Sequence, residues 1–319
     1  MSGLSTSLPE FTEKLLSAAR LAGADAADAL ASIGSAIEIN VRSGVLEQAE
    51  RSEAMDLGLR VFIGQRQAVV SGSDLRDGTL STMAERAVAM AKEAPDDPYA
   101  GLAAPEQLAM DWNIEELELY DAQPEPSAAA LEADALVAEA AALRVAGIEQ
   151  VDAASASYGS GQVHFQTSAG FAGGYQRTSR SISCVAIAGT GLQMERDYDF
   201  DNRIFQEDLT DPAEIGANAG ARAVARLKPS KPPTGQFPVL FDERVASSLI
   251  GHFLGAINGA SVARGSSWLL EGLGQQVFPD GTQLIEDPHR PRVAGSRPFD
   301  GEGLPTQRRA LVENGVLTG

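Results

Sequence analysis

Apolar residues recur at helical spacing at the start of the chain and at alternate positions soon after it. The run 9–22 predicts a helix that stops at Gly23, because its apolar side chains share one face. That face is formed by Phe11, Leu15, Leu16 and Ala19. Two later runs, AIEINVR (36–42) and LGLRVFI (57–63), alternate with period two and predict strands with one buried face.

The pair Gly64-Gln65 separates the second of these runs from RQAVVSG (66–72). A two-residue connection that begins with glycine is typical of a type II′ hairpin turn. A second helix is expected from Asp77 to just before Pro95. A helix, antiparallel strands and another helix indicate an α+β region, not a repeated βαβ unit.

The stretch 95–126 is rich in Pro, Asp and Glu and is expected to be a surface connection. The run 127–145 then predicts a helix, whose buried stripe consists of Leu131, Ala135, Leu136 and Leu143. A meander is expected next, with the glycines of GSGQV and AGGYQ in its turns, and a helix over 212–227 follows it. The strand-like runs of this meander are 151–158, 162–170, 177–189 and 191–200.

The proline-rich run KPSKPPTG (228–235) is the strongest boundary signal in the chain. Beyond it we expect an apolar strand at FPVLF (237–241), a helix that carries His252, and a hairpin. Asn314-Gly315 predicts the type I′ turn of this hairpin. Its second arm stops after Thr318, so we expect an unpaired strand edge there and a chain that is a fragment of a longer protein.

These patterns predict an α+β fold. An N-terminal helix and antiparallel-strand region and a central meander with flanking helices precede a β-rich C-terminal domain that is truncated. The predicted boundaries are an N-terminal domain at 1–103, a central domain at 104–227, a linker at 228–235 and an incomplete C-terminal domain at 236–319.

Composition narrows the classes of function. Acidic residues outnumber basic ones by 44 to 25, and the net charge of −19 argues against direct nucleic-acid binding. The single cysteine, Cys184, suits a reducing compartment. The N-terminus has no signal-peptide pattern, and the longest uncharged run, 245–263, is too polar to span a membrane. We therefore expect a cytoplasmic protein without membrane contact.

His252 lies in ASSLIGHFLGA (246–256), and we considered it as a metal ligand and as a catalytic base. A zinc peptidase helix needs a second histidine and a glutamate, and neither lies one turn away. His164 and His289 fall in other segments. Ser248 could pair with His252 across one helical turn, but no strained nucleophile turn or orienting acid accompanies it. A structural hydrogen bond between the two is the favoured interpretation.

Small residues recur every four positions along the same helix, at Ser247, Gly251, Gly255 and Gly259. Glycine costs up to ~1 kcal/mol in a helix interior relative to alanine, so a close approach to another backbone is expected there. Packing on the domain's own sheet is favoured, and a partner-docking surface is the alternative.

Four blocks of sequence resemble the TldD/PmbA family, and within it the PmbA branch, also called TldE. They are 41–71, 77–103, 118–124 and 299–319, of which the glycine-rich strand pair near 57–72 and DGEGLPTQ…ENGVL are the most specific. The resemblance implies a two-subunit cytoplasmic metallopeptidase. Its TldD subunit carries a zinc helix of the form H-E-x-x-x-H, and the TldE subunit lacks it.

Aligning that zinc helix on the shared Gly-His pair places Gly251-His252 at the end of the motif. Ser247 then stands where the first histidine belongs and Ser248 where the glutamate belongs. The position of the remaining ligand would lie beyond Gly319. The resemblance therefore implies no catalytic residue and no metal in this chain, with zinc held by a TldD-like partner.

We expect a non-catalytic subunit of a peptidase that processes small or unfolded polypeptides, with a TldD-like protein as its partner. Two alternatives stay open: a self-sufficient metallopeptidase with unrecognised ligands, and a homodimeric binding or scaffold protein without a proteolytic role.

Overall fold

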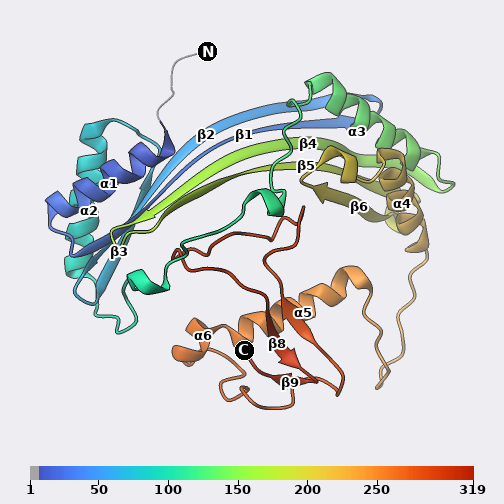
Figure 1. Ribbon diagram of the computed structural model, residues 1–319. Helices are drawn as coiled ribbons and strands as arrows, with labels where there is room; N and C mark the ends of the chain where they lie inside the picture. The colour runs from blue at the N-terminus through green and yellow to red at the C-terminus, as the bar shows by residue number, and fades with distance from the viewer. Residues whose placement is uncertain (1–6) are drawn as a thin grey trace. The chain divides into compact units, whose positions relative to one another are not determined.

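The computed structural model describes residues 7–319, which form two compact units (Figure 1). The first unit contains the chain through Pro229 together with His289–Thr306. The second contains Ser230–Pro288 and Gln307–Gly319. The chain thus leaves the first unit within KPSKPPTG, builds most of the second, and returns to the first before it completes the second.

Six antiparallel strands form a curled sheet in the first unit, in the order β3-β2-β1-β4-β5-β6 (Figure 1). They are β1 (Ala26–Arg42), β2 (Val45–Ile63), β3 (Arg66–Gly72), β4 (Ile148–Thr167), β5 (Ala172–Ala188) and β6 (Glu195–Arg203). β1 pairs with β2 on one side and with β4 on the other. Strands from both sides of residue 103 therefore share one sheet. The predicted α+β class is confirmed, whereas the domain boundaries stay a prediction.

The strands are longer than the alternating runs predicted, and two predicted turns are wrong. GSGQV lies inside β4 and AGGYQ inside β5. Gly174 shows why glycine is needed there, because a Cβ at this position would overlap the carbonyl oxygen of Val163 on the neighbouring strand. A close approach of two backbones and a turn both favour glycine, so composition alone did not separate them.

Two pairs of helices cover the two ends of one face of the sheet (Figure 1). They are α1 (Leu8–Ala22) with α2 (Asp77–Glu93), and α3 (Ala128–Leu143) with α4 (Pro212–Ala225). Alternate residues of β1 face the helices. The first half of β1 packs under α1 and α2, and the second half packs under α3 and α4. These residues are Ala27, Ala29 and Ala31 in the first half and Ile37, Ile39 and Val41 in the second.

The helix boundaries agree with the predicted signals, but the buried stripe of α3 does not. α1 ends at Gly23, which has φ +97° as the sequence requires. In α3, Leu131 and Ala135 are buried as expected, whereas Leu143 is 44% exposed. Alanines complete the stripe instead, because α4 packs too closely for larger side chains.

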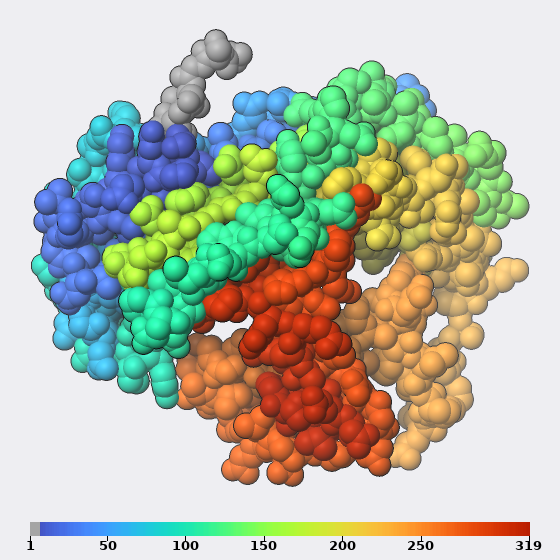
Figure 2. Space-filling model, viewed as in Figure 1, coloured from blue at the N-terminus to red at the C-terminus, as the bar shows by residue number. Residues whose placement is uncertain are grey.

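Irregular chain packs against part of the opposite face of the sheet, and it includes part of the predicted surface connection 95–126. This stretch contains the short 3-10 helices η1 (Pro105–Gln107) and η2 (Glu115–Leu117); η3 (Gly191–Gln193) and η4 (Gln206–Asp208) lie farther along the chain. Leu108 packs with Phe165, Phe171 and Phe299, and the amide of Ala109 donates to Gly303 O at 2.8 Å. Figure 2 shows this connection lying beside the returning segment 289–306. The connection lies mostly at the surface, as predicted, but Leu108, Ala109, Leu117, Leu119 and Asp121 are buried. Irregular backbone buries such residues without a period that a sequence pattern reveals.

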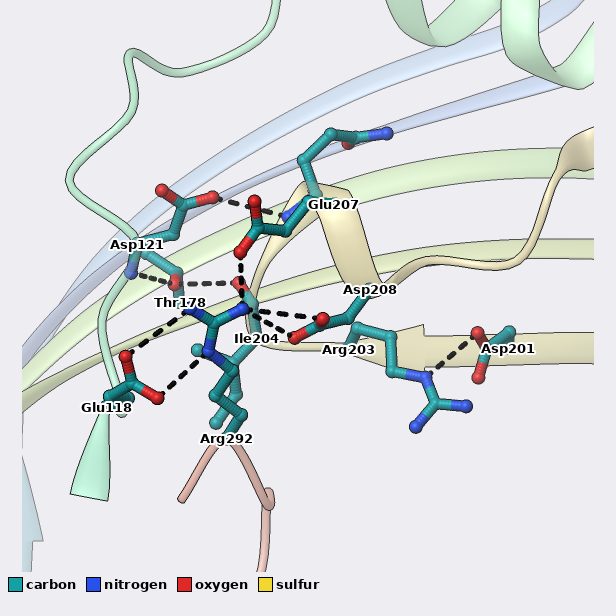
Figure 3. A network of polar contacts seen from close by, with 10 residues as sticks. Glu118, Asp121, Thr178, Asp201, Arg203, Ile204, Glu207, Asp208 and Arg292 are labelled. Carbon is teal, nitrogen blue, oxygen red and sulfur yellow. Dashed lines mark hydrogen bonds and ion pairs between the residues drawn. The ribbon is translucent and has the colours of Figure 1, made fainter. Parts of the chain in front are cut away.

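Arg292 holds the returning segment 289–306 against the rest of the first unit (Figure 3). Its guanidinium donates to both carboxylate oxygens of Glu118, at 3.0 and 3.3 Å, and also contacts Glu207 and Asp208. It lies 4.0 Å from the centre of the Phe205 ring. These hydrogen bonds, first of all those with Glu118, raise the pKa of Arg292 above its already high usual value. Arg292 and Glu118 both have positive φ, of 57° and 45°, a conformation that such residues adopt only when their surroundings hold it.

The second unit contains α5 (Glu243–Ile257), α6 (Gly259–Ala263) and a three-stranded sheet in the order β7-β8-β9. The strands are β7 (Leu284–Glu286), β8 (Arg309–Glu313) and β9 (Val316–Leu317). The predicted type I′ turn is confirmed by positive φ at both Asn314 and Gly315.

Two expectations for this unit were wrong. FPVLF (237–241) forms no strand and is exposed. The outer side of β9 is paired, because the amide of Leu317 donates to Gln275 O at 3.0 Å and its carbonyl accepts from Gly274 N at 2.8 Å. The sequence between 264 and 288 gave no strand signal that would have predicted this pairing.

In the part of the chain that the structure describes, no helix combines the length and apolar character needed to cross a bilayer.

Candidate functional site

The α5 helix carries the residues that the sequence singled out as a candidate site, except Gly259, which starts α6. It begins after Asp242, whose carboxylate accepts a hydrogen bond from the Arg244 amide at 3.0 Å and so caps the helix. Its inner face is anchored by Phe253, which meets the Phe278 ring edge-on with centroids 4.9 Å apart. Phe253 is buried with Val312 and Leu317 of the small sheet, and this packing fixes which side of α5 faces outward.

Ser247, Ser248 and His252 all lie on exposed positions of α5. The Ser248 hydroxyl donates to Val245 O at 2.6 Å, and that of Ser247 reaches Arg244 O at 3.5 Å. The expected hydrogen bond between Ser248 and His252 is therefore wrong: the Ser248 proton is directed at its own helix backbone. A serine held in this way is not activated by the imidazole, which removes the nucleophile–base interpretation.

The residues around His252 do not suit a zinc ion. Zinc sites in proteins use at least three histidine, cysteine or carboxylate ligands. Among residues 7–319, no group of three or more such side chains is placed to hold a metal ion. His164 and His289 contact Thr12 and Thr306, at 2.9 and 3.0 Å, and burial lowers the pKa of His164.

The small-residue face of α5 is open. A Cβ built on Gly251, Gly255 or Gly259 would meet no atom within 4 Å. The favoured interpretation, close packing on the domain's own sheet, is therefore not what the structure has. The face is also shorter than expected, because the helix breaks at Asn258 and Gly259 starts α6, with the Asn258 side chain accepting from Ser261 N.

Several apolar side chains of α5 and of the chain before it are also exposed. Val245, Leu249 and Leu254 of α5 are 50%, 45% and 40% exposed. The chain directly before α5 adds Phe237, Val239, Leu240 and Phe241, all exposed. Leu254 lies beside the glycine face, because it is three residues from Gly251, whereas Val245 and Leu249 lie on the side of α5 that also carries Phe253.

The most specific block of the resemblance, DGEGLPTQ, has a structural role in the first unit. The Asp300 carboxylate accepts from the amides of Glu302 and Leu304, at 2.8 and 2.9 Å, and so shapes the turn. Glu302 then pairs at 2.9 Å with Arg60, which also binds the buried Asp28. Burial raises the pKa of Asp28, although Arg60 opposes this shift. Sequence reasoning missed this partly buried cluster because its members lie far apart in the chain.

Comparisons with known proteins point to one family. Its models describe the PmbA/TldA metallopeptidase domain 1, central domain and C-terminal domain, and they match residues 27–91, 121–227 and 234–319. The chain is 37% identical over 298 residues to "Metalloprotease PmbA homolog" of Haemophilus influenzae, covering 93% of this chain. It is 34% identical over 294 residues to "Metalloprotease PmbA" of Escherichia coli O157:H7, covering 92% of this chain. The chain spans 65% of the length of each of these two relatives.

Solved structures share the fold. A putative modulator of DNA gyrase from Bacteroides thetaiotaomicron is similar with a TM-score of 0.85 and 25% identity, over 97% of this chain and 70% of that one. TldE from Thermococcus kodakarensis matches with a TM-score of 0.75 and 19% identity, over 96% of this chain and 68% of that one.

Proposed function

Because the chain belongs to the PmbA/TldD family of metallopeptidase-related proteins, we propose that it is a TldE-type subunit without a catalytic metal of its own. In this proposal it assembles with a TldD-like subunit, and the pair processes small or unfolded polypeptides in the cytoplasm. The zinc and the glutamate that activate water belong to the partner, and this chain contributes docking surface and walls of the substrate chamber.

The side chains at the degenerate motif positions carry this proposal. Ser247 and Ser248 stand where the resemblance expects a histidine and a glutamate, and their hydroxyls contact carbonyls of their own helix. A serine hydroxyl at neutral pH neither replaces an imidazole as a zinc ligand nor accepts a proton as a carboxylate does. His252 alone supplies one ligand, which is too few for a zinc site.

The outward face of α5 supports a docking role. Gly251 and Gly255 of α5, and Gly259 at the start of α6, have open space above them, so another backbone can approach closely. Leu254 beside Gly251 adds exposed apolar area to bury. The helix therefore offers a surface that a TldD-like subunit would cover, on the same element that carries the degenerate motif.

Two further observations support the proposed compartment and the proposed class of partner, respectively. Cys184 is buried and makes no disulfide. The net charge of −19 disfavours contact with DNA, even though two structural neighbours are named as putative modulators of DNA gyrase.

The proposal is tested by mixing the purified chain with a TldD-like protein and measuring complex formation and peptide hydrolysis. We expect hydrolysis only in the mixture, and loss of the complex with Gly255→Arg. Gly78→Arg is the matched control, because Gly78 is also a helical glycine with no atom within 4 Å of its Cβ position.

Two outcomes would overturn the proposal. The curated relatives are named metalloproteases, so hydrolysis by the chain alone, abolished by His252→Ala, would identify a self-sufficient enzyme. A stable homodimer that binds no TldD-like protein would identify the chain as a binding or scaffold protein.

A further inference from the structure

One long edge of the first unit's sheet has no strand beside it. β3 pairs with β2 only from Leu57 to Ile63, so the outer side of Val45–Asp56 carries no ladder. No turn or loop backbone among the described residues donates to or accepts from this stretch. Val45 to Ala54 are all exposed, and β2 follows the rim of the sheet in Figure 1. An open edge of this kind is a template for another extended chain.

The edge is strongly acidic, and part of its charge is left without a counter-ion. It contains Glu47, Glu50, Glu53 and Asp56, but a single basic residue, Arg51. Arg51 pairs with Glu53 and Glu125, and Arg42 pairs with Glu47. Among residues 7–319, no lysine or arginine forms an ion pair with Glu50 or Asp56.

A cross-strand pair adds to this excess. Glu50 lies directly opposite Glu38 in the register of β1 and β2. Like charges that face each other across a ladder destabilise it, so a cation placed beside them would relieve the repulsion. Asp56 lies on the same face of β2 as Glu50, because the two are separated by an even number of residues.

Space for added side chains is present on this face. A hollow of about 460 Å³ is lined by Ser52, Ala54 and Asp56 of β2 and by Tyr175 and Arg177 of β5. Arg177 donates there to the carbonyls of Ala294 and Ser296, and among residues 7–319 it forms no ion pair with a carboxylate of the edge. Asp56 of the edge therefore borders a hollow in which the small side chains of Ser52 and Ala54 leave room.

Charge excludes a second copy of this chain as the occupant. Pairing β2 with β2 of another copy would bring two acidic edges together, which costs free energy at every facing carboxylate. A basic partner strand has the complementary pattern, since alternate lysines or arginines would lie over Glu50 and Asp56 while its backbone completes the ladder.

We propose that the β2 edge from Val45 to Asp56 binds a basic polypeptide segment in extended conformation as an added strand. The occupant is a segment of an unfolded client, so the inference names a substrate class and to that extent rests on the proposed function. A segment of about 12 residues, roughly 40 Å long at 3.4 Å per residue, would fill the edge.

The test uses the isolated chain of residues 1–319 and a fluorescein-labelled peptide of alternating lysine and threonine, with binding followed by anisotropy. We expect saturable binding that weakens with added salt, weaker binding of a peptide of the same composition with its lysines in one block, and none of a glutamate–threonine peptide. Because no partner subunit is present, this binding succeeds or fails independently of whether a TldD-like protein is recruited.

Two sets of variants separate strand addition from simple charge attraction. Only one set of alternate peptide amides faces the edge, so N-methylation of one alternate set should abolish binding and N-methylation of the other should not. Glu50→Gln and Asp56→Asn should each weaken binding by about 1.5- to 5-fold, the range of exposed ion pairs, whereas Glu85→Gln on exposed α2 surface should not. Equal binding of both N-methylated peptides, or unchanged affinity in the Glu50 and Asp56 variants, would overturn the proposal.

Discussion

Replacing the α5 glycines by alanine should stabilise the free chain and weaken its complex. Gly251 and Gly255 lie within α5, and no atom lies within 4 Å of the Cβ position at either site. The substitution therefore introduces no clash and removes the helix penalty of glycine, which is about 1 kcal/mol in a helix interior. Gly251 should give most of this gain, and Gly255, in the last turn, a smaller part of it.

Hydrogen exchange of the amides of α5 measures this gain, because local opening of the helix reports local stability. A gain of about 1 kcal/mol corresponds to roughly fivefold slower exchange in Gly251→Ala. Gly216→Ala is the control, because it should make exchange faster in the amides of its own helix, α4. A Cβ at Gly216 would overlap the Ala138 carbonyl of α3, and overpacking of this kind costs about 1–3 kcal/mol.

Docking should respond in the opposite direction. If a TldD-like backbone approaches the glycine face, an added methyl group costs about 1–3 kcal/mol of binding, or roughly 5- to 150-fold in Kd. Faster exchange in Gly251→Ala would refute the reasoning, because it would mean that the face is already packed in the free chain. Slower exchange with unchanged affinity for the partner would place docking elsewhere.

The remaining predictions concern the first unit. Burial raises the pKa of the Cys184 thiol to about 12. A thiol reagent should therefore modify Cys184 at neutral pH only when the sheet unfolds, and fast labelling of the native chain would contradict its place in the core. Hydrogen bonds from the Arg76 side chain and amide, and from Thr79, lower the pKa of Asp74. Asp74 therefore contributes stability above its unfolded pKa near 3.8 that is lost as the pH falls, and Asp74→Asn should flatten the dependence of the unfolding free energy on pH below about 4. Arg292→Ala leaves Glu118, Glu207 and Asp208 without their shared cation. Limited proteolysis should therefore cut the segment 289–306 faster in Arg292→Ala than in the control Arg290→Ala. Equal rates of cleavage would show that other contacts hold the segment.

The sequence was sufficient wherever a local signal has one physical meaning. The end of α1 at Gly23 and the turn at Asn314-Gly315 require positive φ, and both were predicted to the residue. The helix that carries His252 was also predicted from its period and lies at Glu243–Ile257.

Prediction from sequence failed where one residue pattern is compatible with two structures, or where the contacting residues are distant in sequence. The glycines of GSGQV and AGGYQ favour turns by composition but lie inside β4 and β5, where Gly174 permits the backbone of β4 to approach. The Arg60–Asp28–Glu302 cluster joins three segments, and nothing local to any of them indicates the others. The exposed edge of β2 was likewise invisible, because strand length beyond the alternating run depends on β1 and not on its own period.

The central claim is that this chain holds no catalytic metal, and zinc analysis of the purified chain tests it most directly. The account predicts that elemental analysis after dialysis against zinc finds far less than one ion per chain, with no difference between the parent and His252→Ala. One tightly held zinc per chain that is lost in His252→Ala would contradict it.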